Sequence, residues 1–191
     1  MIPYNYLQSM KIAAETAMTA HKGQCRKYND APYVVHPARV TQLVLIYDNT
    51  AYKGAIIAWM HDILEDCGQE GEKLVTNAIA TMPLSDTIKL EIVMSIQALT
   101  KNDTIHPRQA KWDNCIARVI NDSSNFTKLV KICDRIDNLM DMIGFTKEFM
   151  KIYLNETQQF INALNLLDLN IAESEALDTL IQITKTTYTK L

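Results

Sequence analysis

Two potential metal ligands and two further carboxylates lie close together in the segment WMHDILED, residues 59–66. His61 and Asp62 are neighbours, and Glu65 and Asp66 follow one helical turn later. On a helix the first pair projects about 100° apart, close enough to hold one ion, and the second pair would overhang that ion. Imidazole with carboxylate suits manganese, iron or zinc, and such an ion makes bound water acidic enough to supply hydroxide near neutral pH. A short motif can also be an exposed acidic helix end.

Two more residues could complete a ligand set. Asp134 lies in a strongly apolar helical segment, residues 129–139. A carboxylate buried there needs a cation or hydrogen-bond donors, which a metal, Arg135 or a nearby lysine would provide. His36 immediately precedes Pro37, and its alternatives are capping of a helix N-terminus or simple surface placement.

The ordered set His36, His61-Asp62 and Asp134 resembles the H...HD...D signature of the HD superfamily, in which helices bring these residues onto one metal. Longer strings resemble the hydrolase domain of RelA/SpoT-type enzymes, in that family's order and with similar separations. They are HKGQCRK at 21–27, PYVVHP at 32–37, HDILED at 61–66, LTK at 99–101 and KICDRIDN at 131–138. The C-terminal region fits this pattern more loosely.

The resemblance implies an activity: hydrolysis of the 3′-pyrophosphate of the alarmone (p)ppGpp, giving GDP or GTP plus pyrophosphate. It implies a divalent metal, usually Mn2+, and the chain resembles stand-alone small alarmone hydrolases such as the metazoan SpoT homologue. By this match the residues take three roles. The ligands would be His36, His61, Asp62 and Asp134, the water would be handled by Glu65 and Asp66, and the nucleotide would be contacted by Arg26, Lys27 and Asn138.

The elements that must position these residues are predicted to be helices. Glycine and proline number only five each, and apolar residues recur at spacings of three and four. We therefore expect an all-α, single-domain HD-type bundle over 1–191, with a motif-bearing core at about 18–140 and C-terminal helices at about 148–186. The predicted helices cover 4–22, 37–49, 51–66, parts of 71–99 divided near Pro83, 109–120, 126–143, 148–167 and 172–186.

Bulk properties restrict the partners. The net charge of -3 and a pI near 5.8 argue against a nucleic-acid binder. No stretch reaches membrane length, and the four cysteines form no CxxC pair, so we expect a cytoplasmic protein with reduced thiols, no membrane partner and no disulfides. A homo-oligomer is compatible with the sequence.

Several charged residues have simpler interpretations. Arg26 and Lys27 could be solvated loop cations, and solvated charge is the preferred interpretation of Arg108 and Lys111. His21 fits the end of the first helix, where a partly cationic side chain meets the C-terminal dipole. His106 is interpreted as a loop residue, and the region 102–125 departs from the family pattern.

Two other functions remain open on the sequence. An HD phosphohydrolase could act on another nucleotide, such as a deoxynucleoside monophosphate or the 2′-phosphate of NADPH. A non-catalytic nucleotide sensor could keep the same fold, although it would not need the carboxylates Glu65 and Asp66. The Arg26-Lys27 loop together with Asn138 favours the alarmone.

Overall fold

The regular secondary structure of the described residues is helical. The protein is represented by a computed structural model that describes residues 1–27, 30–122, 124, 126–142, 144–189 and 191. Cys25 and Pro32 form an isolated antiparallel bridge. In chain order the helices are α1 (Tyr4–Ala20), α2 (Val35–Tyr47), α3 (Tyr52–Met60), α4 (Ile63–Asp66), α5 (Gly68–Thr81), α6 (Asp86–Leu99), α7 (Arg108–Asn121), α8 (Thr127–Met140), α9 (Lys147–Leu164) and α10 (Ile171–Tyr188).

These helices confirm the all-α prediction, and most of the predicted boundaries are within three residues of those observed. The predicted end of one helix at Ile143, and Asn29, Ser123 and Asn125 of the predicted loops, lie outside the described residues. None of the described helices combines the length and apolar character needed to cross a bilayer.

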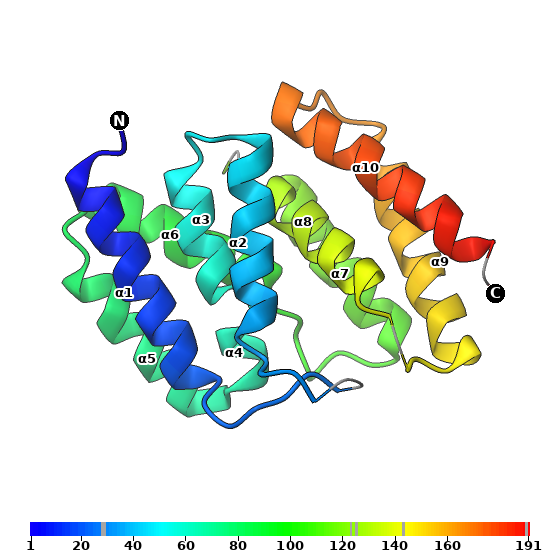
Figure 1. The fold of residues 1–191 in the computed structure, drawn as a ribbon, viewed down its shortest axis with the longest axis horizontal. Helices are drawn as coiled ribbons and strands as arrows, with labels where there is room; N and C mark the ends of the chain where they lie inside the picture. The colour runs from blue at the N-terminus through cyan, green and yellow to red at the C-terminus, as the bar shows by residue number, and fades with distance from the viewer. Residues whose placement is uncertain (28–29, 123, 125, 143, 190) are drawn as a thin grey trace.

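The helices pack as two groups that meet at α2 and α8 (Figure 1). On one side α3 packs against α1, α2 and α6, and α5 packs against α1 and α4. On the other side α10 packs against α8 and α9, and α7 joins α6, α8 and α9. Contact between α2 and α8 joins the two groups, so residues of α2 and α8 can face each other across the middle of the molecule.

Helix α8 is buried on nearly all sides. Its apolar residues, among them Leu129, Val130 and Ile132, belong to the hydrophobic core. Between them four charged residues are also buried: Lys131, Asp134, Arg135 and Asp137. A buried charge needs a partner, so the polar face of α8 must meet other charged groups.

The third predicted helix, 51–66, is interrupted at His61 and Asp62, and this part of the prediction is wrong. α3 ends at Met60 and α4 begins at Ile63. His61 Nδ1 lies 2.7 Å from the carbonyl oxygen of Ala58, which in a continuous helix would accept the N–H of Asp62. The interruption places the His61-Asp62 pair at a junction between helices.

Close packing around Gly71 fixes the short α4 against α5. A Cβ atom at position 71 would lie 2.6 Å from the carbonyl oxygen of Ile63 and 2.7 Å from Cys67 Cβ. Backbone cannot yield as a flexible side chain can, so this position has no room for a methyl group. The absence of a side chain at Gly71 therefore lets α5 approach the segment that follows the His61-Asp62 junction.

We predict that Gly71→Ala destabilises the protein. In an open helix this change would stabilise by about 0.5–1 kcal/mol, but here the new methyl group meets backbone, and overpacking typically costs about 1–3 kcal/mol. Urea unfolding would measure the loss. Asn77→Ala, exposed on the same helix, is the control and should change the free energy of unfolding by less than about 0.5 kcal/mol. Equal stability of Gly71→Ala and the unmodified protein would contradict the argument.

Candidate metal centre and nucleotide cavity

Three parts of the chain converge on one group of side chains: the first turn of α2, the α3–α4 junction and the middle of α8. His36, His61 and Asp134 each offer a ligand atom, and these atoms lie within 4.8 Å of one another. Asp134 Oδ1 is 3.2 Å from His36 Nε2 and 3.8 Å from His61 Nε2. Asp62 Oδ2 lies 3.3 Å from His36 Nε2 and 3.2 Å from His61 Nε2. The structure thus brings together all four residues predicted as ligands.

Both imidazole rings turn Nε2 toward this group. The Ala58 carbonyl can only accept, so His61 Nδ1 carries the proton of that hydrogen bond. His61 Nε2 is buried, and although Asp62 Oδ2 lies 3.2 Å away, no described residue meets it with hydrogen-bond geometry. His36 Nδ1 is directed away from the group as well, to Asp137 Oδ2 at 2.6 Å. When neutral, rings held this way present the Nε2 lone pairs to the carboxylates, so a cation is needed there, either a proton on the ring or a metal ion.

The spacing of the donor atoms fits one shared ion. Adjacent ligands about 2.1 Å from a common ion lie roughly 3 Å apart. The two contacts of Asp62 Oδ2 with the imidazoles, at 3.3 and 3.2 Å, match this separation. Because the site also has the imidazole and carboxylate donors that divalent transition ions accept, the residues present fit such an ion.

The pKa values of the two histidines reveal how negative the site is. Burial alone would disfavour protonation of His61, yet Asp62 and Asp134 outweigh it and raise its pKa to about 9. The pKa of His36 is likewise raised despite burial, through its hydrogen bonds with Asp134 and Asp137. The carboxylates therefore favour a cation at this position, whether a proton or a metal ion.

Asp134 is held from two further directions. Lys131 Nζ lies 2.9 Å from Oδ2, and Asn138 Nδ2 donates to Oδ1 at 2.6 Å. Burial opposes ionisation of this carboxyl, but the charge of Lys131 and the histidines keep its pKa well below the usual value. The salt bridge considered from the sequence is thus present and involves Lys131, while Arg135 pairs with Glu156 instead. It coexists with the histidine contacts because the two oxygens face different partners.

Tyr33 supports Asp62 from the other side. Its hydroxyl donates to Asp62 Oδ2 at 2.7 Å. Burial, followed by the charges of Asp62 and Asp66, raises the tyrosine pKa, so the hydroxyl keeps its proton. The ring stacks on His21 at a centroid distance of 4.6 Å. His21 ends α1 as predicted, but it is buried and binds Gln24, which a helix-dipole argument alone did not foresee.

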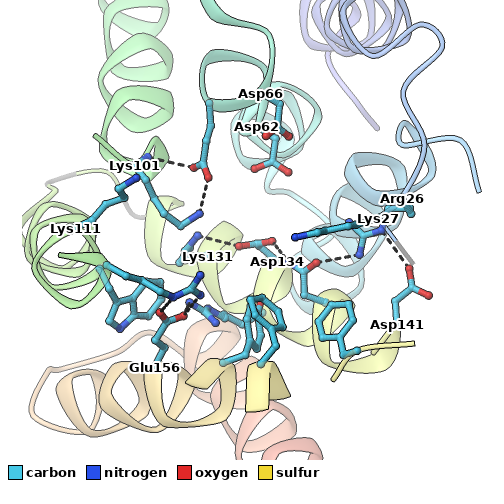
Figure 2. A pocket seen from close by; sticks show the side chains of 18 of the residues that line it. Arg26, Lys27, Asp62, Asp66, Lys101, Lys111, Lys131, Asp134, Asp141 and Glu156 are labelled. Atoms are coloured by element: carbon cyan, nitrogen blue, oxygen red, sulfur yellow. Dashed lines mark hydrogen bonds and ion pairs between the residues drawn. The ribbon is translucent and has the colours of Figure 1, made fainter. Parts of the chain in front are cut away.

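A cavity of about 490 Å³ opens beside the ligand group, and Figure 2 shows cationic side chains on both sides of Asp62 and Asp134. Its basic lining residues are Arg26, Lys27, Lys101, Arg108, Lys111, Lys131 and Arg135. Its acidic lining residues are Asp62, Glu65, Asp66, Asp103, Asp134, Asp141 and Glu156. The formal charges of these two sets cancel, so the described lining carries no net positive charge until a metal ion joins it.

The predicted water-handling residues both line the cavity. Glu65 is fixed by Lys101, whose Nζ lies 2.7 Å from Oε1 and whose backbone N–H donates to Oε2 at 3.2 Å. Burial and the charge of Asp62 raise the pKa of Asp66. The two carboxylates therefore have different environments, one paired with a cation and one beside another carboxylate.

The predicted nucleotide-binding residues also lie at the cavity. Arg26 is largely buried, and its Nη2 donates to Asn138 Oδ1 at 2.9 Å. Lys27 Nζ lies 5.9 Å from the centre of the Phe149 ring. The interpretation of Arg26 as a solvated loop cation therefore fails, and Asn138 connects this loop with Asp134.

Two cations for which solvated charge was the preferred interpretation line the cavity, and each pairs with a carboxylate. Arg108 makes two hydrogen bonds to Glu156, at 2.7 and 3.0 Å, and Lys111 pairs with Asp103 at 2.7 Å. His106, interpreted as a loop residue, lies in a loop that also borders the cavity. These residues fall in the region 102–125, whose sequence gave no familiar pattern, so only the folded arrangement reveals their position.

Sequence reasoning assigned no role to Tyr33, Lys101 or Asp137, although all three lie in the quoted motifs. The available signal for Asp137 was its position three residues after Asp134 on a helix, which places both on one face. For Tyr33 and Lys101 the contacts with Asp62 and Glu65 span 29 and 36 residues. No local periodicity predicts such contacts.

Comparison with known proteins gives one relationship to an enzyme. A protein named guanosine-3′,5′-bis(diphosphate) 3′-pyrophosphohydrolase, from Borreliella burgdorferi, is 28% identical over 136 residues. The match covers 69% of this chain and 19% of that protein, so the chain spans about a fifth of the relative's length. No protein-family model matches the chain. The similarity supports a relationship with HD-type hydrolases, and it assigns no activity to this chain.

The raised pKa of His61 predicts that ion uptake depends on pH. A ligand imidazole must be neutral, whereas a group with a pKa of about 9 carries a proton near neutral pH. An ion entering the group displaces that proton, so its apparent affinity should rise as the pH rises toward 9. We expect Kd to fall about tenfold per pH unit for each proton displaced.

Isothermal titration calorimetry with Mn2+, between about pH 6 and about pH 8, would measure this slope. Buffers of different ionisation enthalpy would count the released protons directly. A Kd that does not change with pH, without proton release, would contradict the inferred protonation of His61.

Proposed function

We propose that this chain hydrolyses the 3′-pyrophosphate of (p)ppGpp, giving GDP or GTP and pyrophosphate, with Mn2+ as the metal. The observation that carries the proposal is the convergence of His36, His61, Asp62 and Asp134 beside a cavity with cationic side chains on both sides. The similarity to a protein named for this reaction supports it. The proposal concerns this hydrolytic reaction alone, because most of that relative lies outside the match.

The ligand group would hold the ion through two imidazole nitrogens and two carboxylates. When bound, a divalent ion supplies Lewis-acid stabilisation of charge on the phosphate and makes nearby water more acidic. The protein's contribution is to keep His36 and His61 in the orientation that exposes Nε2, through Asp137 and the Ala58 carbonyl. Such support from outside the ligand set commonly affects metal affinity by about 10–100-fold.

Glu65 and Asp66 would orient and deprotonate the attacking water. Glu65 is held in place by two hydrogen bonds from Lys101, which restricts its side chain beside the cavity. Asp66 has a raised pKa, and a base with a pKa closer to neutrality accepts a proton more effectively. The water oxygen would bond to the phosphorus joined to the 3′ oxygen of the ribose, and the bond between that phosphorus and the 3′ oxygen would break. The 3′ oxygen would leave and take up a proton, which gives GDP or GTP, and the attacked diphosphate would be released as pyrophosphate.

The substrate's negative charge would be met on both sides of the ligand group. Arg26 and Lys27 lie on one side and would contact the nucleotide, with Asn138 reaching the sugar or base. Lys101 and Lys111 line the other side. Charge-assisted hydrogen bonds from such groups both position a polyphosphate and stabilise the charge that develops during hydrolysis.

A nucleotide panel tests the reaction itself. We expect purified protein with Mn2+ to convert ppGpp into GDP and pyrophosphate, resolved by ion-exchange chromatography, and to lose this activity when a chelator removes the metal. Release of inorganic phosphate from a deoxynucleoside monophosphate or from NADPH, without ppGpp turnover, would identify a different phosphohydrolase. Binding of nucleotides with no turnover of any would identify a sensor.

Two substitutions separate metal binding from water handling. His61→Ala should remove both bound metal and activity, because it deletes a proposed ligand. Glu65→Gln keeps the shape and removes the charge, so it should retain metal and fold while turnover falls by about 100-fold or more. Metal analysis, melting temperature and ppGpp turnover would be measured on both variants. Near-normal turnover of Glu65→Gln would exclude that residue from the mechanism, and full metal content in His61→Ala would overturn the ligand assignment.

A further inference from the structure

A series of hydrogen bonds begins at His36 Nδ1, on the side of the ring opposite the ligand group. His36 Nδ1 lies 2.6 Å from Asp137 Oδ2. Arg39 donates two hydrogen bonds to the same carboxylate, from Nε to Oδ1 at 2.6 Å and from Nη2 to Oδ2 at 3.2 Å. His36 and Arg39 are three residues apart on α2, so one face of that helix presents both to α8. Asp137 thus has the imidazole of a proposed ligand on one side and a guanidinium on the other.

The contacts continue from Arg39 to the loop that faces the cavity. Arg39 Nη2 donates to Asp141 Oδ2 at 2.9 Å, and Arg26 Nε donates to the same oxygen at 3.2 Å. Asp141 therefore connects an arginine of α2 with an arginine of the loop after α1. Both interactions link segments about a hundred residues apart, 102 and 115 positions respectively.

The path returns to the ligand group through Asn138. Arg26 Nη2 donates to Asn138 Oδ1 at 2.9 Å, and Asn138 Nδ2 donates to Asp134 Oδ1 at 2.6 Å. The same Asp134 oxygen lies 3.2 Å from His36 Nε2, which closes a ring of contacts. We call it the arginine ring. Its members are His36, Asp137, Arg39, Asp141, Arg26, Asn138 and Asp134.

The ring could be a structural network that only joins α2 to α8. Its connections instead indicate a role in both the ligand group and the nucleotide contact. Two of its members, His36 and Asp134, belong to the proposed ligand set, and a third, Arg26, is proposed to contact the nucleotide. Asp137 is 5% exposed and Arg26 is 11% exposed, as side chains, so these charges depend on their partners in a low dielectric. A displacement of Arg26 would therefore change the positions of both proposed ligands, His36 and Asp134.

We propose that Asp137 and Arg39 are positioning residues for His36, and that Asp141 links them to Arg26 so that metal binding and nucleotide binding strengthen each other. This inference rests on the proposed function. Asp137 accepts the Nδ1 proton of His36, which keeps Nε2 free for an ion, and Arg39 fixes the carboxylate. Nucleotide binding at Arg26 and metal binding at His36 would each restrict the same ring. Each would therefore favour the other, which is reciprocal coupling.

The first test uses Mn2+ alone, so it does not depend on the identity of the substrate. Asp137→Asn keeps the shape of the side chain and removes the charge that holds His36 and Arg39, so the Kd for Mn2+ measured by calorimetry should rise about 10–100-fold. Asp141→Asn should leave that Kd within about threefold, a change of less than 1 kcal/mol. Glu91→Gln, which removes a partly buried ion pair with Lys53 outside the ring, is the control and should leave Mn2+ affinity unchanged.

The second test measures coupling with GDP, which lacks the 3′-diphosphate that would contact the metal directly. In the unmodified protein saturating Mn2+ should tighten GDP binding by about fivefold or more, the lower range of typical coupling. This ratio should fall in Asp141→Asn and Arg39→Ala, which leave Arg26 joined to the ligand group only through Asn138. Arg39→Lys keeps the charge but loses the planar fork that meets both carboxylates, so it should recover part of the ratio. Arg39 is 40% exposed as a side chain, so these variants remain usable if Asp137→Asn does not fold.

The outcomes separate the inference from the proposed function. A folded Asp137→Asn protein with unchanged Mn2+ affinity would overturn the positioning role, and an unchanged coupling ratio in Asp141→Asn and Arg39→Ala would overturn the link to Arg26. Lower melting temperatures with both quantities unaltered would show a structural network only, which also overturns the inference. Mn2+ binding without ppGpp hydrolysis would contradict the proposed reaction and leave the ring supported by its own measurements. Absence of Mn2+ binding in the unmodified protein would overturn both.

Discussion

The carboxylate of Asp134 is buried on a helix whose other side forms the hydrophobic core, and its charge requires compensation within a low dielectric. Lys131 supplies part of that compensation at one oxygen. The other oxygen faces His36 and Asn138, which come from a different helix and from the next turn of the same helix. The contacts that compensate the Asp134 carboxylate thereby fix how α2 packs against α8. The positions of the remaining site residues depend on that packing.

The interruption between α3 and α4 follows from the same demand. A continuous helix would keep the Ala58 carbonyl for a backbone N–H, yet here it binds His61 Nδ1 and orients the ring. With α3 ending at Met60, His61 Nε2 lies 3.8 Å from the α8 carboxylate, and Asp62 Oδ2 lies 3.2 Å from His61 Nε2 and 3.3 Å from His36 Nε2. The helix is interrupted where two potential ligand side chains must converge, and such departures from regular structure are common at functional sites. Gly71 then allows α5 to pack closely behind the short α4.

Features that depend on local sequence could be predicted, whereas features that depend on long-range contacts could not. Apolar spacing and sparse glycine and proline predicted the helices, because the core side of each helix depends on its own periodicity. The resemblance of His36, His61-Asp62 and Asp134 to the H...HD...D signature predicted which side chains would converge. It could not predict the break at His61, which depends on a side chain to backbone hydrogen bond, nor that Arg39 meets Asp141 102 residues away. The pairing of Arg108 with Glu156, 48 positions away on another helix, could not be predicted for the same reason.

Under the proposed function, the balance of charge in the cavity would give a bound metal ion a role beyond activating water. Among the described lining residues the basic and acidic side chains cancel formally, and most of these cations are engaged by carboxylates, as Lys101 is by Glu65 and Arg108 by Glu156. A polyphosphate entering such a cavity meets paired cations, whose attraction is weakened by their neighbours. A divalent ion at the ligand group would shift the local charge by two units and would draw the carboxylates toward itself. Metal occupancy would thus affect the affinity for a polyanionic substrate as well as the chemistry, because the ion would supply the positive charge that the paired cations of the lining do not.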